Sequence, residues 1–126
     1  MANGIKLLII DDNEEVLDSL SQYFHKKGYC VISASNGLDG IKLLESEKQG
    51  FDLIITDLIM PNISGFGIIS IAKKNAPNLP VIAITGWGEH PEALAAEVHA
   101  DLVLEKPFEL AELDKCITAL ISRRKS

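Results

Sequence analysis

The sequence predicts a single α/β domain, a doubly wound, five-stranded parallel sheet with helices on both faces. Segments of aliphatic and β-branched residues alternate with segments of helical periodicity along the whole length, a pattern typical of βαβ units. Several apolar segments are continuous, as expected for parallel strands that are buried on both faces. A chain of 126 residues is also long enough to bury a core without disulfides or structural metals.

Five segments rich in aliphatic and β-branched residues are predicted to be strands. The first, third and fourth are continuous apolar runs, which places them at the centre of the sheet. The predicted strands are Ile5–Ile10, Tyr29–Ala34, Phe51–Thr56, Pro80–Thr85 and Asp101–Leu104.

Five further segments carry apolar residues at helical spacing. Asp12 or Asn13 is the expected N-cap of the first helix, and Gly28 is its expected C-terminal stop. Asn36 is expected to cap the second helix, with Asp39 in the position where a capping box places an acid. The predicted helices are Glu14–Lys27, Gly37–Lys48, Ser64–Asn75, Pro91–Val98 and Glu109–Ser122.

Composition narrows the function classes. The net charge of −6, from 18 acidic and 12 basic residues, argues against direct nucleic-acid binding, which needs a basic face. No apolar stretch approaches the roughly 20 residues that span a bilayer, and no export signal is visible, so a cytoplasmic location without membrane attachment is expected. Cys30 and Cys116 form no CxxC pair and are expected to pack as small hydrophobic residues.

Charged residues stand where three predicted strands end. Asp11 and Asp12 follow the first strand, Asp57 follows the third, and Lys106 follows the fifth. The carboxyl ends of parallel strands lie at one edge of an open sheet, where such folds gather their ligand groups. Two unit charges about 4 Å apart repel by roughly 4 kcal/mol at an effective dielectric constant near 20, so clustered carboxylates require a cation. A divalent metal is the simplest candidate, although Asp11 and Asp12 taken alone would also suit the start of a helix.

This set of residues resembles the receiver domain of two-component response regulators. The run Asp57–Pro61 followed by Gly65 is similar to the phosphorylation loop of that family, and Lys106–Phe108 is similar to its lysine-proline loop. Thr85, at the end of the fourth predicted strand, completes the set. The resemblance covers nearly the whole chain and implies a flavodoxin-like sheet with strand order 2-1-3-4-5.

The resemblance implies a receiver domain over residues 1–122 and a basic tail over residues 123–126. The tail is interpreted as a solvated helix end, with the start of a linker to an output domain as the alternative. The implied partners are a sensor histidine kinase or histidine phosphotransfer protein and a downstream output domain or protein. A phosphorylation-dependent homodimer is a further expectation, and the sequence does not decide it.

The resemblance implies three catalytic residues. Asp57 would be the nucleophile that takes a phosphoryl group from a phosphohistidine. Lys106 would neutralise charge on the phosphoryl oxygens, and Thr85 would donate a hydrogen bond to one of them. The protein would catalyse only its own phosphorylation and dephosphorylation, so it is not expected to be an enzyme acting on other substrates.

The resemblance also implies Mg²⁺ as the cofactor. This hard ion prefers oxygen ligands and retains several waters. The implied ligands are the carboxylates of Asp12 and Asp57 and the backbone carbonyl of Ile59, with Asp11 acting through water.

One position departs from the family pattern. Val103, three residues before Lys106, stands where many receivers carry an aromatic residue. The switch by which Thr85 moves and an aromatic ring is buried therefore cannot operate here in its usual form. The implied switch surface is the fourth helix, the fifth strand and the fifth helix, and the Lys106-Pro107 peptide is expected to be cis.

Two other function classes stay open. A Mg²⁺-dependent phosphohydrolase also uses an aspartyl nucleophile, but that class spaces two aspartates as Asp-x-Asp on the first strand, whereas Asp11 and Asp12 are adjacent. A phosphorylation-independent, receiver-like interaction module is favoured by Val103 and opposed by the complete set of site residues.

Ile59 and Trp87 generate the first prediction. They stand two residues after Asp57 and Thr85, at positions that, by resemblance, tune the access of water to the pocket. Because both are bulky and apolar, loss of phosphate from Asp57 is expected to be slow. Ile59→Asn or Trp87→Glu should accelerate that loss, measured as the decay of phosphorylated protein after the donor is removed. An unchanged decay in both variants would contradict this expectation.

Overall fold

The fold was analysed in a computed structural model that describes residues 4–47, 50–58, 60, 65–86 and 100–125. The predicted fourth helix, Pro91–Val98, lies outside the described residues. Ile59 and Trp87 also lie outside them, so their expected roles stay predictions.

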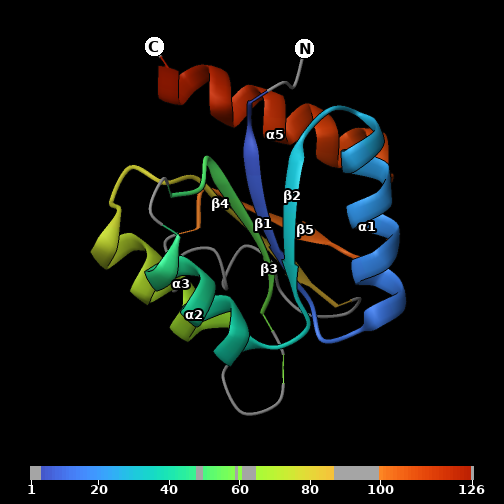
Figure 1. The fold of residues 1–126 in the computed structure, drawn as a ribbon. Coiled ribbons are helices and arrows are strands. Elements are labelled where there is room, and N and C mark those ends of the chain that lie inside the picture. The colour runs from blue at the N-terminus through green and yellow to red at the C-terminus, as the bar shows by residue number, and fades with distance from the viewer. Residues whose placement is uncertain (1–3, 48–49, 59, 61–64, 87–99, 126) are drawn as a thin grey trace.

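Five parallel strands form one sheet, in the order β2-β1-β3-β4-β5 (Figure 1). This confirms the predicted fold class and strand order. Each strand begins one or two residues later than predicted, while β3 and β5 each end one residue later and so include Asp57 and Glu105. The strands are β1 (Lys6–Ile10), β2 (Cys30–Ala34), β3 (Leu53–Asp57), β4 (Val81–Thr85) and β5 (Leu102–Glu105).

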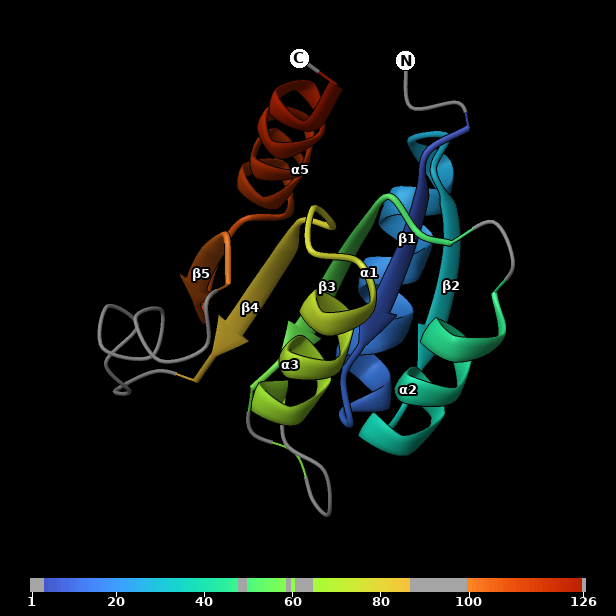
Figure 2. The same ribbon diagram turned by 90° about the vertical axis from the view of Figure 1, so that its left-hand side faces the viewer.

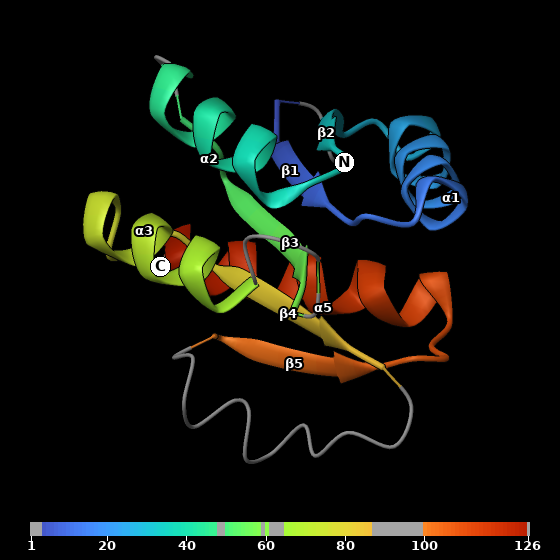
Figure 3. The same cartoon turned by 90° about the horizontal axis from the view of Figure 1, so that it is seen from below.

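Helices cover both faces of the sheet, with α1 and α5 on one side and α2 and α3 on the other (Figures 2 and 3). The last helix extends three residues beyond its predicted end at Ser122, so residues 123–125 continue the helix. No helix within the described ranges is long and apolar enough to cross a membrane. The helices are α1 (Glu14–Lys26), α2 (Gly37–Ser46), α3 (Gly65–Asn75) and α5 (Leu110–Lys125).

Side-chain caps define where the first two helices begin. Asn13, rather than Asp12, caps α1, because its Oδ1 accepts hydrogen bonds from the backbone N–H of Glu15 and Val16. Asn36 caps α2 by accepting from the backbone N–H of Asp39 at 2.8 Å. The Asp39 carboxylate accepts from the Asn36 side-chain amide, whereas a capping box would bond it to the backbone N–H.

Alternation along the central strands divides the core into two apolar layers. In β1, Leu7 and Ile9 pack with the residues of α1 and α5, whereas Leu8 and Ile10 pack with those of α2 and α3. These four side chains are at most 1% exposed, as expected for a strand covered on both faces. The expectation that Cys30 is packed is wrong, because edge strand β2 leaves it exposed.

Two aspartates tie the amino ends of neighbouring strands together. The carboxylate of Asp52 accepts the backbone N–H of Lys6 at 2.8 Å, just before β3 begins. The carboxylate of Asp101, just before β5, accepts both the backbone N–H of Val81 and the ammonium of Lys73, each at 2.8 Å. These bonds therefore join neighbouring strands at the amino edge of the sheet. The acids Asp11, Asp12 and Asp57 lie at the opposite, carboxyl edge.

The Asp101 contacts generate a stability prediction. Asp101→Ala should lower the free energy of unfolding by about 1–3 kcal/mol, because it leaves the N–H of buried Val81 without its acceptor. Asp18→Ala, at an exposed position of α1, should change it by less than about 0.5 kcal/mol. Urea unfolding measures both, and equal losses would contradict the prediction.

Candidate functional site

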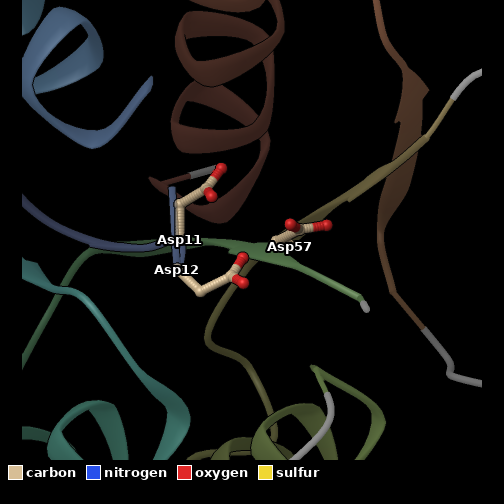
Figure 4. Close-up of side chains that lie close together, drawn as sticks. All are labelled: Asp11, Asp12 and Asp57. Atoms are coloured by element: carbon tan, nitrogen blue, oxygen red, sulfur yellow. The ribbon is translucent and has the colours of Figure 1, made fainter. Parts of the chain in front are cut away.

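Three carboxylates meet where β1 and β3 end. The two strands are adjacent and parallel, with Ile10 paired to Thr56, so the residues that follow them come to the same place. Asp11 and Asp12 follow β1, and Asp57 is the last residue of β3. One carboxylate oxygen from each lies within 4.8 Å of the other two, and Figure 4 shows the three side chains gathered in one region.

Asp11 is held by backbone contacts on both sides. Its own N–H donates to the carbonyl of Ala34 in β2 at 3.2 Å, and its Oδ1 accepts the N–H of Asn13 at 2.9 Å. The residue is 1% exposed, and its second oxygen, Oδ2, is buried and accepts no hydrogen bond from the described residues. Asp12 differs, because it is exposed.

Lys106 is the cation that the described structure brings to the cluster. Its Nζ lies 3.5 Å from Asp11 Oδ2 and 3.8 Å from Asp57 Oδ2. Both distances exceed the roughly 2.7–2.9 Å of a charge-assisted hydrogen bond, so these contacts are ion pairs without a short hydrogen bond. Its backbone N–H donates to the carbonyl of Thr85 at 2.9 Å, and the Lys106-Pro107 peptide is cis, as predicted.

Thr85 ends β4, the strand between β3 and β5. Its side chain is fully buried, and its hydroxyl lies 3.5 Å from the carbonyl of Leu104 in β5, at the long limit of a hydrogen bond. Val103, which is also in β5, is partly buried and packs against the apolar layer of α2 and α3. The backbone of β5 is therefore the neighbour that the Thr85 hydroxyl contacts.

The cluster suits a hard divalent cation. All its donors are carboxylate oxygens, the ligand type that Mg²⁺ prefers. Within the part of the chain that the structure describes, Lys106 brings one ammonium to three carboxylates, and Asp11 Oδ2 accepts no hydrogen bond there. The fourth implied ligand, the carbonyl of Ile59, lies outside the described residues.

Two neighbours of Asp57 have structural roles that the sequence reasoning missed. Thr56 is fully buried, and its hydroxyl donates to the carbonyl of Asp57 at 3.0 Å. Gly65, the first residue of α3, lies so close to β3 that a Cβ there would be 2.3 Å from the Asp57 carbonyl oxygen. Its N–H donates to the carbonyl of Leu58 at 3.0 Å. The available signal for Thr56 was a hydroxyl at the end of an otherwise apolar strand.

A groove of about 460 Å³ opens beside Lys106. One wall is the first half of α1 and the other is the loop from β5 to α5. The lining combines apolar side chains with one acid, one hydroxyl and one ammonium: Glu15, Val16, Ser19, Leu20, Lys106, Pro107, Phe108 and Leu110.

Comparisons with known proteins identify the family of this chain. The family profile described as "Response regulator receiver domain" matches residues 7–118. The response regulator SaeR from Staphylococcus aureus is 32% identical over 120 residues, which cover 94% of this chain and 51% of SaeR. The chain thus spans about half the length of the curated relatives it matches.

Solved structures give the same result. A receiver domain protein from Clostridium thermocellum has a TM-score of 0.88 and 32% identity, covering 96% of this chain and 97% of that one. The response regulator TrrA from Thermotoga maritima, in complex with Mg²⁺ and BeF, has a TM-score of 0.82 and 27% identity, covering 92% of this chain and 98% of that one.

The close approach of α3 to β3 generates a prediction for Gly65→Ala. Alanine is the better helix former by about 1 kcal/mol, yet the variant should be less stable, because its Cβ would overlap the backbone of Asp57 and Leu58. Overpacking of this kind typically costs about 1–3 kcal/mol. Ser70→Ala, at an exposed position of the same helix, is the matched control and should lose no stability in urea unfolding. A Gly65→Ala protein as stable as the parent would show that α3 can move away freely.

Proposed function

Because the chain belongs to the response regulator receiver domain family, we propose that Asp57 accepts a phosphoryl group from a phosphohistidine of a sensor histidine kinase or histidine phosphotransfer protein. The observation that carries the proposal is the convergence of Asp11, Asp12 and Asp57 within 4.8 Å, with Lys106 beside them. Such a site combines a nucleophile with a surplus of negative charge that only an added cation can balance.

In the proposed reaction, a carboxylate oxygen of Asp57 attacks phosphorus. A new O–P bond forms as the P–N bond to the donor imidazole breaks, and the imidazole leaves with the electron pair and takes up a proton. Phosphoryl transfer depends mainly on positioning and charge neutralisation. Lys106 is suited to neutralise the transferred oxygens, because its Nζ lies 3.8 Å from Asp57 Oδ2.

Mg²⁺ is the proposed cofactor. When bound, it would supply the positive charge that offsets the carboxylates and the transferred oxygens. Asp12 and Asp57 would hold it directly together with the Ile59 carbonyl. Asp11 would act through water, which fits a buried Oδ2 that accepts no hydrogen bond from the described residues.

The groove between α1 and the β5–α5 loop supports the approach of a protein donor. It begins at Lys106, so an apolar segment bound along Val16 and Phe108 would lie next to the site. A donor histidine on that segment could then present its phosphoryl group to Asp57.

We further propose that phosphorylation changes a surface read by an output domain or partner protein. Thr85 would turn its hydroxyl from the Leu104 carbonyl, 3.5 Å away, to a phosphoryl oxygen. Because Val103 replaces the usual aromatic residue, the change would pass through the backbone of β5.

The second candidate function is a receiver-like interaction module that works without phosphate. Val103 is the residue that favours it. A phosphohydrolase has less support, because its two acids would flank a nucleophile on β1, whereas Asp57 is on β3.

Direct detection of the adduct tests the proposal. Incubation with phosphoramidate and Mg²⁺ should increase the intact mass by one phosphoryl group. The adduct should be absent in Asp57→Asn and strongly reduced when a chelator removes the metal. Asp18→Asn, which alters an exposed carboxylate of α1, is the control and should be modified like the parent. An unmodified parent protein, or a modified Asp57→Asn, would refute the proposal.

A further inference from the structure

We infer that Thr56 is a positioning residue for the proposed magnesium and phosphoryl site, an inference that rests on the proposed function. Its hydroxyl donates to the backbone carbonyl of Asp57 at 3.0 Å, and the side chain is fully buried. This bond reaches the backbone of Asp57, so the effect on the chemistry that we infer acts through that backbone.

The peptide group that joins Asp57 to Leu58 is bonded at both of its polar atoms. Its carbonyl oxygen accepts from the Thr56 hydroxyl, and its N–H, on Leu58, donates to the carbonyl of Ile84 in β4 at 3.0 Å. The next carbonyl, that of Leu58, accepts from the N–H of Gly65 at 3.0 Å. Three successive backbone groups are therefore fixed at the point where the chain leaves β3.

This point controls the geometry of the site. The residue pairing of β3 with β4 ends at Asp57 and Ile84, so from Leu58 onward the direction of the chain depends on the bonds just described. Rotation of the peptide between Asp57 and Leu58 would redirect the chain that leads from Asp57 to the proposed carbonyl ligand at Ile59. Groups that orient metal ligands in this way are as much a part of a metal site as the ligands themselves.

Packing alone does not explain the hydroxyl. Valine has nearly the same shape as threonine, is common in strands and buries no polar atom. The Thr56 side chain is 0% exposed. Burying its hydroxyl is therefore unfavourable unless the hydroxyl forms a hydrogen bond. The bond that it forms is the one to the Asp57 carbonyl.

The test compares Thr56→Val, which removes the donor, with Thr56→Ser, which keeps it. Ile54→Val is the matched control, because it trims a fully buried side chain of the same strand that has no polar contact. Mg²⁺ affinity is measured by calorimetry, the backbone amide signals of Leu58 and Gly65 by NMR without metal, and stability by thermal unfolding.

Thr56→Val should weaken Mg²⁺ binding by about 10- to 100-fold and shift the Leu58 and Gly65 amide signals. Thr56→Ser should keep most of the affinity. Ile54→Val should lower the unfolding temperature without changing Mg²⁺ affinity, which separates positioning from general loss of stability.

Three outcomes would overturn the inference. The first is a Thr56→Val protein that binds Mg²⁺ like the parent, and the second is a Thr56→Ser protein as weak as Thr56→Val. The third is an Ile54→Val protein that loses affinity in proportion to its stability. Each of these leaves the proposed function intact, whereas a parent protein that binds no Mg²⁺ would refute the proposed function together with this inference.

Discussion

The clustering of negative charge at one edge of the sheet is the constraint on which the rest of the site depends. Three carboxylate groups lie within 4.8 Å of one another, and Lys106 supplies a single positive charge at 3.5 and 3.8 Å from two of them. Carboxylates this close repel one another, so the surrounding backbone must hold them in place. The same repulsion explains the proposed affinity of the site for a cation. A bound cation would in turn offset the negative charge of a transferred phosphoryl group.

The contacts that stabilise the fold and the acids that repel one another lie in different parts of the molecule. At the amino edge, Asp52 and Asp101 bond the first backbone N–H groups of neighbouring strands, and two apolar layers bury the strand interiors. At the carboxyl edge, the Thr56 hydroxyl bonds the Asp57 carbonyl and the Gly65 N–H bonds the Leu58 carbonyl. The backbone that holds the acids is therefore stabilised mainly by the amino edge of the sheet and by the two apolar layers.

Alternation of apolar and helical segments was sufficient to predict the five strands and four described helices, because both periodicities arise from local geometry. The juxtaposition of Asp11 with Asp57 was also predictable, since parallel strands end at a common edge. The structural roles of Thr56 and Gly65 were not, because they depend on distances between segments that no periodicity encodes. Cys30 was misjudged for a related reason: an apolar neighbourhood in sequence does not reveal that its strand lies at the edge of the sheet.

Lys106 belongs to two environments at once, since it lies beside Asp11 and Asp57 and also lines the groove along α1. Any protein bound in that groove and any ion held by the acids would thus share one side chain. Thermodynamic linkage then requires reciprocity: if the bound protein changes the affinity for the ion by some factor, the ion changes the affinity for the protein by the same factor. A single lysine would in this way allow a docked partner to sense whether the acidic site is loaded.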